Sequence, residues 1–268
     1  MKCEKGDVSE IHYIEMLKAL EVFAYRVFLF QGKRSNAGRS SFFRFGHDVF
    51  SDETNIRIIT VWIHEWTRYY SNEAEFRGDV EAPSDWYLTR NLLKYTLYEY
   101  ELHLLAAKGK QIKPQLQWKD LTDSTIEHIF PQHPAKGSAW KRLWDKKSID
   151  TLLHDIGNLV LTRDNSSYQN FDFERKKGNP GISPSYANSD IRQEREISQY
   201  NEWTPLQVTE RRAELADWII NRWKTDSGTT SVATAVIEEL EEELDEEELD
   251  DIEDLGANDN ASVHTVNS

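Results

Sequence analysis

The chain of 268 residues contains a single cysteine, Cys3, and no long apolar run. One thiol excludes an internal disulfide and a zinc site built on paired thiolates, so a metal would have to be held by His, Asn or carboxylates. No stretch approaches the roughly 20 apolar residues that a membrane-spanning helix needs. The N-terminus lacks the pattern of a signal peptide. These absences predict a cytoplasmic protein that does not interact with a membrane.

A glycine-rich phosphate loop is also missing. The run Gly32-Lys33-Arg34-Ser35 resembles the end of such a loop but lacks its earlier glycine. The sequence therefore gives no sign of a nucleotide-binding P-loop.

Negative charge is abundant but unevenly distributed. The formal net charge is -15, and the segment 238–259 holds 14 of the 47 acids and no Lys or Arg, which leaves 33 acids against 32 bases elsewhere. The body is therefore close to neutral and compatible with a nucleic-acid partner. We expect residues 227–268 to form an acidic, disordered tail, because like charges repel one another along it.

Hydrophobic periodicity predicts a mainly α protein with a small inserted core in the strand, excursion, strand and helix order of a ββα-metal motif, and therefore an α+β fold. Apolar residues recur at helical spacing in five segments, 8–30, 56–70, 85–106, 191–200 and 206–223. Between them, short extended segments at 115–118, 125–129 and 158–162 precede a short helix at 171–177. We expect a helical region over 1–110 that packs on a ββα core over 111–178, followed by C-terminal helices of the same domain over 179–226.

The adjacent residues Glu127 and His128 are the strongest chemical signal in this central segment. Phosphodiester cleavage needs a base that activates water and a cation that offsets charge on the phosphate and the leaving oxygen. His128 is the candidate general base, because imidazole titrates near neutral pH. Glu127 and Asn165 are the candidate ligands of one Mg²⁺ or Mn²⁺, since hard cations prefer carboxylate and amide oxygens.

Other polar residues are expected to support this centre. Asn158, which follows a glycine at the start of the second strand, is assigned to the catalytic group, where its amide can brace the loop that carries His128. His154 and Asn170 are expected to have structural roles. Positive charge that could hold the DNA backbone comes from four residues, Arg163, Arg175, Lys176 and Lys177.

Each of these residues has an ordinary explanation when it is taken alone. A single His is more often structural than catalytic, lysines commonly form a solvated face, and Asn165-Ser166-Ser167 is typical of a turn or helix cap. The aromatic residues, including Trp62, Trp66, Trp86 and Trp218, are expected to pack in the core rather than stack on bases. The order of the motifs along the chain favours the nuclease interpretation.

In this order the sequence resembles the C-terminal HNH domain of GmrSD-type modification-dependent restriction endonucleases, within the His-Me finger superfamily. The resemblance covers roughly residues 10–225. Its matching phrases are Ser124-Thr125-Ile126-Glu127-His128-Ile129-Phe130-Pro131-Gln132, His154-Asp155-Ile156-Gly157-Asn158-Leu159-Val160-Leu161 and Asn165-Ser166-Ser167, followed by Asn170, Phe173 and Lys176.

The resemblance implies a metal-dependent DNA endonuclease or nickase, the cleavage module of an anti-phage, modification-dependent restriction system. Family members usually carry an upstream ParB-like domain that couples NTP hydrolysis to recognition of modified phage DNA. No such domain is recognised in this sequence, so we expect either that a separate ParB-like subunit is the partner or that the chain is a fragment or a stand-alone relative. Two alternatives stay open: a catalytically inactive or partner-dependent module that binds nucleic acid, and a nuclease that acts on RNA.

Overall fold

The computed structural model describes residues 9–51, 55–107, 116–163, 165–179, 181 and 183–225. These residues belong to two compact units. The first unit takes the described residues within 1–23, 35–70 and 225–268, and the second takes those within 24–34 and 71–224. Cys3 and the acidic tail lie outside the described residues, and the statements made about them above stay predictions.

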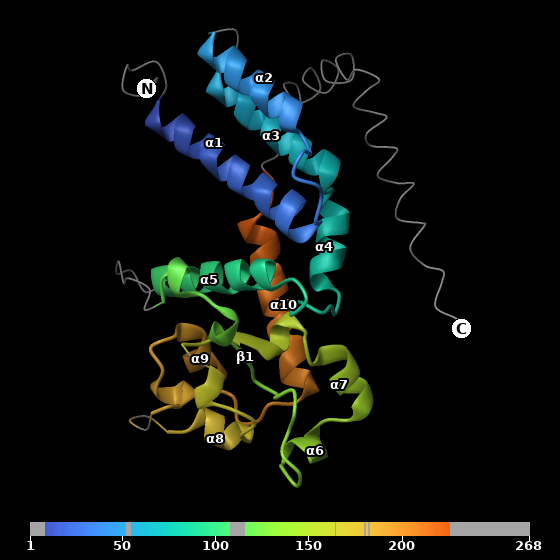
Figure 1. Ribbon diagram of the computed structural model, residues 1–268, viewed down its shortest axis with the longest axis vertical. Coiled ribbons are helices and arrows are strands. Elements are labelled where there is room, and N and C mark those ends of the chain that lie inside the picture. Colours follow the sequence, from blue (N-terminus) through green and yellow to red (C-terminus); the bar gives the residue numbers. More distant parts are fainter. Residues whose placement is uncertain are drawn as a thin grey trace, which may run out of the picture. The chain divides into compact units, whose positions relative to one another are not determined.

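The first unit is helical (Figure 1). It contains α1 (Glu10–Phe23), α2 (Arg39–Phe50) and α3 (Ile56–Tyr70), and α1 packs against α3. The rings of Phe23 and Phe42 meet edge to face at 5.0 Å, and those of Phe45 and Trp62 stack at 4.7 Å. Aromatic packing of this kind is what the sequence predicted for Trp62.

The second unit contains the remaining elements. They are the π-helix η1 (Ala24–Phe30), α4 (Glu73–Glu81), α5 (Arg90–Ala106), η2 (Trp118–Asp120), η3 (Asp123–Thr125), β1 (Ile126–His128), α6 (Trp140–Leu143), α7 (Lys146–Leu152), η4 (Ile156–Asn158), β2 (Leu159–Leu161), η5 (Asn165–Ser167), α8 (Phe173–Lys177), η6 (Tyr186–Asn188), α9 (Arg192–Ile197) and α10 (Pro205–Arg222). Helix α10 begins where Thr204 caps the backbone N–H of Leu206 and proline takes the first helical position.

Strands β1 and β2 form an antiparallel hairpin-like pair in which Glu127 lies opposite Val160. Helices α5 and α9 both contact β2, and Figure 1 shows β1 between α5 and the segment that carries α8 and α9. The order of strand, excursion, strand and short helix is the one predicted from the sequence. The fold class, mainly α with a small β component, is confirmed.

A buried apolar cluster surrounds the strand pair and fixes its position. Its members are Ile129, Phe130, Trp140, Trp144, Leu152, Val160, Tyr168, Phe173, Tyr186, Ile197, Trp203 and Val208. They come from β2, from the excursion between the strands and from the segments that follow β2. Burial of this many large side chains holds two strands of three residues each, which would not be stable as an isolated pair.

Several boundaries differ from the sequence prediction. Of the extended segment expected at 115–118, Gln117 has an extended backbone, but Trp118 begins the 3₁₀ turn Trp118–Asp120 and none of the described residues 116–118 belongs to a strand. The helix expected from residue 85 begins at Arg90, because the Asp85 side chain accepts hydrogen bonds from the N–H groups of Tyr87 and Leu88 and holds a turn there. Helices α2, α4, α6 and α7 were not predicted.

Helices α4 and α5, which the sequence assigned to the N-terminal helical region, belong to the same unit as the strand pair. Among the described residues, no helix is long and apolar enough to cross a membrane.

Candidate nuclease site

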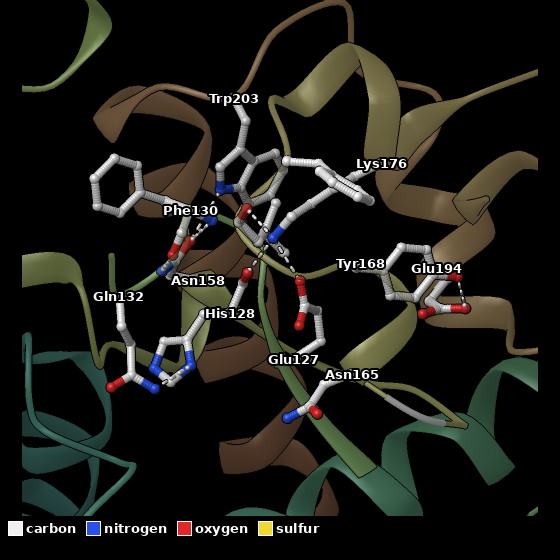
Figure 2. A network of polar contacts seen from close by, with 12 residues as sticks. Glu127, His128, Phe130, Gln132, Asn158, Asn165, Tyr168, Lys176, Glu194 and Trp203 are labelled. Atoms are coloured by element: carbon white, nitrogen blue, oxygen red, sulfur yellow. Dashed lines mark hydrogen bonds and ion pairs between the residues drawn. The ribbon is translucent and has the colours of Figure 1, made fainter. Parts of the chain in front are cut away.

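The candidate site lies where β1 ends. Beyond the paired residues of the two strands, the N–H of Ile129 donates to the carbonyl of Asn158 at 3.0 Å. Side chains alternate along a strand, so Glu127 and His128 leave β1 on opposite faces. Figure 2 shows the two side chains on the two sides of the strand.

Asn158 braces the segment that follows His128. Its Oδ1 accepts from the N–H of Phe130 at 2.8 Å and from the indole N–H of Trp203 at 3.1 Å. Its Nδ2 donates to the carbonyls of Phe130 at 3.0 Å and Leu153 at 2.9 Å. The residue is fully buried and its amide is occupied by these partners. This corrects the assignment of Asn158 to the catalytic group, because the side chain is inaccessible to substrate and acts by positioning the chain after His128.

His128 is held between two polar partners and an aromatic ring. Its Nε2 lies 3.0 Å from Nδ1 of His154, and its Nδ1 lies 3.3 Å from Nε2 of Gln132. Tyr87 meets the His128 ring edge to face at 4.7 Å and stacks on His154 at 5.4 Å. The expected structural role of His154 thus takes a specific form, a contact with the imidazole of His128.

The environment of His128 disfavours its charged form. Burial, followed by the neighbouring His154, Lys176 and Arg90, lowers the pKa of His128 to about 3. The ring is therefore neutral at physiological pH and keeps a lone pair on one nitrogen. An anionic phosphate brought close to it would raise this pKa, because a negative charge stabilises the imidazolium.

On the other face of β1, Glu127 is paired with Lys176. The Lys176 ammonium donates to Oε1 of Glu127 at 2.5 Å and to the carbonyls of His128 at 2.8 Å and Ile129 at 3.0 Å. Three acceptors match its three N–H groups, and Lys176 is 0% exposed. This corrects the prediction that Lys176 contacts the DNA backbone, because its charge is inside the protein and holds the end of β1.

A second buried carboxylate belongs to the surroundings of Glu127. Burial raises the pKa of Glu194, on α9, to about 7, and the hydroxyl of Tyr168 donates to its Oε2 at 3.2 Å. Burial likewise raises the pKa of Glu127 to about 7, although Lys176 opposes the shift. The sequence analysis missed Glu194. Its position three residues after the buried Ile191 was a usable signal, since residues three apart share a helix face.

Asn165 lies at the start of η5 beside β1. Its Nδ2 donates to the carbonyl of Ile126 at 3.0 Å, which orients the side-chain amide next to the strand. Figure 2 shows Asn165 on the Glu127 side of the site, with the second Glu127 oxygen turned away from Lys176. Glu127 and Asn165, the two candidate oxygen donors, thus lie at one face of β1, and His128 lies at the opposite face.

The comparisons with known proteins bear on this arrangement. The family model of the GmrSD restriction endonucleases, C-terminal domain, matches residues 66–218. The chain belongs to the GmrSD C-terminal domain family. No curated protein and no solved structure gives a significant match. Membership indicates a nuclease module of a restriction endonuclease, and the matched range includes every candidate site residue.

For a GmrSD C-terminal domain, the donors present fit a hard divalent cation. Glu127 supplies a carboxylate and Asn165 an amide, both of them oxygen ligands of the kind that Mg²⁺ and Mn²⁺ prefer. Among the described residues, no cluster of three or more His, Cys, Asp or Glu side chains is placed to hold a metal. Two protein oxygens suit an ion that keeps most of its coordination shell for water and a phosphate.

The other residues expected to bind DNA differ in the contacts that their side chains make within the protein. Arg163 pairs with Asp190, and Lys177 donates to the carbonyl of Tyr200 at 2.7 Å. Arg175 is exposed, and its guanidinium lies 3.3 Å from the centre of the Phe171 ring. Their proposed contacts with DNA stay predictions, and so does the structural role of Asn170, which is exposed.

A buried arginine from the last helix supports the second strand of the domain. Nη1 of Arg211 lies 3.0 Å from the carbonyl oxygen of Ile156, 2.9 Å from that of Gly157 and 2.7 Å from that of Leu159. These carbonyls belong to η4 and β2. Arg211 therefore fixes the backbone that presents Asn158, a role for which no local sequence pattern exists.

Proposed function

We propose that this chain is the cleavage module of a modification-dependent, anti-phage restriction system, a metal-dependent HNH endonuclease or nickase that hydrolyses phosphodiester bonds of DNA. The observation that carries the proposal is the placement of Glu127 and Asn165 at one face of β1 and of His128 at the other, in a chain of the GmrSD C-terminal domain family. The substrate class follows from the family, whose members are restriction endonucleases.

In the proposed mechanism His128 takes a proton from the attacking water. The contact with the amide nitrogen of Gln132 makes Nδ1 of His128 an acceptor, so its hydrogen is on Nε2 and is donated to Nδ1 of His154. The lone pair then points toward Gln132, which is exposed. We assign the proton transfer to Nδ1, where the attacking water takes the place of the exposed Gln132 amide as the partner of this lone pair before its proton moves to the ring.

Glu127 and Asn165 would hold one Mg²⁺ or Mn²⁺ on the other side of β1. When bound, such an ion offsets negative charge on the phosphate and on the leaving 3′-oxygen. Lys176 keeps Glu127 in place by the ion pair and fixes the carbonyls of His128 and Ile129. Asn158 fixes the segment that follows His128 through its two hydrogen bonds with the backbone of Phe130.

The choice of target DNA is assigned to a partner. We infer that a separate ParB-like, NTP-dependent subunit recognises modified phage DNA and delivers it to this module in the cytoplasm. The near neutrality of the body supports this assignment, because affinity for DNA backbone rises with the number of Lys and Arg contacts.

A second candidate function is a module that is inactive alone and needs its partner to become active. The Glu127–Lys176 pair favours it, because the cation that neutralises Glu127 competes with a divalent ion for the same carboxylate. In that case the partner would have to change the position of Lys176 or of α8 before metal binds.

The test is a plasmid-nicking assay with Mg²⁺ or Mn²⁺ on the full chain, with His128→Ala and a matched control, His133→Ala. His133 is an exposed histidine five positions further along. We expect His128→Ala to reduce cleavage about 10²–10⁴-fold, as loss of a general base does, and His133→Ala to leave it unchanged.

Cleavage retained by His128→Ala would refute the assignment of the base. Activity that depends on the partner subunit supports the second candidate function, and a parallel assay on RNA decides which polymer is cut.

A further inference from the structure

The turn before α5 lies against the candidate base. The Asp85 side chain accepts from the N–H groups of Tyr87 and Leu88 at 3.1 and 3.2 Å, which fixes the backbone of this turn. The N–H of Trp86 donates to the carbonyl of His154 at 3.1 Å, which ties the turn to the segment that precedes η4. Tyr87 thus reaches both imidazoles from a fixed backbone.

Arg90 is placed next to His128 through Tyr87. Its guanidinium carbon lies 4.4 Å from the centre of the Tyr87 ring, whose edge-to-face partner at 4.7 Å is His128. One aromatic ring therefore separates an exposed cation from the candidate base. The charge of Arg90 is close enough to help lower the pKa of His128, after burial, His154 and Lys176.

The partner of Arg90 in the free protein is a surface carboxylate. Arg90 donates to Oδ2 of Asp123, and the side chains of the two residues are 44% and 53% exposed. The second Asp123 oxygen lies 3.5 Å from the ammonium of Lys94, one helical turn further along α5. A single carboxylate is thus shared by two cations, so these three side chains together carry one positive charge in excess.

We propose that Arg90 binds a backbone phosphate of the DNA beside the bond to be cut, and that Asp123 occupies Arg90 in the absence of DNA. The inference rests on the proposed function and adds a substrate contact to those predicted for Arg163 and for the basic residues of α8. An arginine guanidinium can bind two phosphate oxygens at once with the same geometry that it uses for a carboxylate.

Replacement of Asp123 by a phosphate as the partner of Arg90 costs little free energy. Exposed ion pairs contribute weakly to stability, because water and salt screen them, so opening the Arg90–Asp123 pair is easy. Lys94 remains beside Asp123 and keeps its charge compensated when Arg90 leaves. Lys176 and Lys177 are less suited to this role, since Lys176 is buried and Lys177 donates to the Tyr200 carbonyl.

The experiment measures binding rather than cleavage. A fluorescent DNA duplex of about 20 base pairs is titrated with the full chain that carries His128→Ala, over a series of salt concentrations, with Arg90→Gln and Asp123→Asn added separately. The matched controls are Arg77→Gln and Glu81→Gln, which alter an exposed ion pair on α4 with side chains 54% and 53% exposed. Circular dichroism checks that each variant is folded.

We expect Arg90→Gln to weaken duplex binding several-fold and to reduce the slope of log K against log salt by about 1, as loss of one phosphate contact does. Asp123→Asn should strengthen binding several-fold, because it removes the competing carboxylate. Both α4 controls should change affinity less than either.

Equal effects in the α5 and α4 pairs, or weaker binding by Asp123→Asn, would overturn the role of Arg90 while DNA binding by the parent chain still supports the proposed function. Failure of the parent chain to bind any duplex would count against the proposed function and this inference together.

Discussion

The two faces of β1 hold their polar side chains by different physical means. On one face a buried ion pair joins Glu127 to Lys176, and Glu194 adds a second buried carboxylate. On the other face His128 is neutral and makes contacts with Gln132 and His154. The first face depends on charge inside the protein and should govern stability. The second depends on a neutral hydrogen-bonded ring and should govern the rate of proton transfer.

Replacement of the buried Lys176 should have the largest effect and tests whether the charged face of β1 governs stability. Lys176→Met leaves Glu127 buried without its partner and frees two carbonyls, so we expect the free energy of unfolding to fall by about 3–5 kcal/mol. Urea denaturation measures it. The double variant Lys176→Met with Glu127→Gln should recover part of the loss, because the unpaired charge is gone. A single variant as stable as the parent would show that the pair does not hold the end of β1.

Glu194 gives a smaller effect with a defined pH dependence. Its pKa rises from 4.5 to about 7 on burial, so the native state binds the proton more tightly than the unfolded state. The contribution of Glu194 to the free energy of unfolding is fully present below pH 4.5. It is lost as pH rises through about 7, and the loss amounts to roughly 3 kcal/mol. We expect Glu194→Gln to be more stable than the parent at pH 8, with a difference that narrows at pH 5.

The control for this prediction is Glu196→Gln, which alters an exposed carboxylate on the same helix. Urea midpoints at the two pH values give the comparison. A constant difference between Glu194→Gln and the parent at both pH values would contradict the assigned pKa.

The smallest effect is expected at His154, on the neutral face. His154→Leu removes the acceptor for the His128 Nε2 hydrogen, and we expect kcat for nicking to fall roughly 10-fold with little change in KM. His154→Asn places an amide oxygen near the lost Nδ1 and should restore most of the rate. Nitrogen chemical shifts of His128 should report hydrogen on Nε2 in the parent and a mixture in His154→Leu. Hydrogen on Nδ1 in the parent protein would reverse the assigned roles of the two ring nitrogens.

Periodic segments were predictable from the sequence, whereas polar helices were not. Helix α3 has the predicted bounds because Ile59, Ile63 and Trp66 recur on one buried face. Helix α4 is short and polar and contains Gly78, so its apolar signal is weak. A usable sign was present in Asn72, whose side chain accepts from the N–H of Glu75 and caps the helix.

The candidate site was predictable in its residue types but not in its contacts. Glu127, His128 and Asn165 could be selected from the sequence because their positions follow the predicted order of strand, excursion, strand and short helix. The burial of Lys176 contradicts the usual exposure of lysine, although its position three residues after Phe173 placed it on the inward face of α8. The contact between Tyr87 and His128 joins distant segments, and nothing local in the sequence encodes it.

Helix α10 determines when, during synthesis, the strands around the candidate site can be held in place. Arg211 holds the carbonyls of Ile156, Gly157 and Leu159, and a Cβ added at Gly157 would lie 2.1 Å from the carbonyl oxygen of Val208 on the same helix. During synthesis β2 therefore lacks its contacts with α10 until residues some fifty positions downstream have left the ribosome. A nascent chain would carry Glu127 and His128 for several seconds, at about 5–20 residues per second, before this support for β2 is complete.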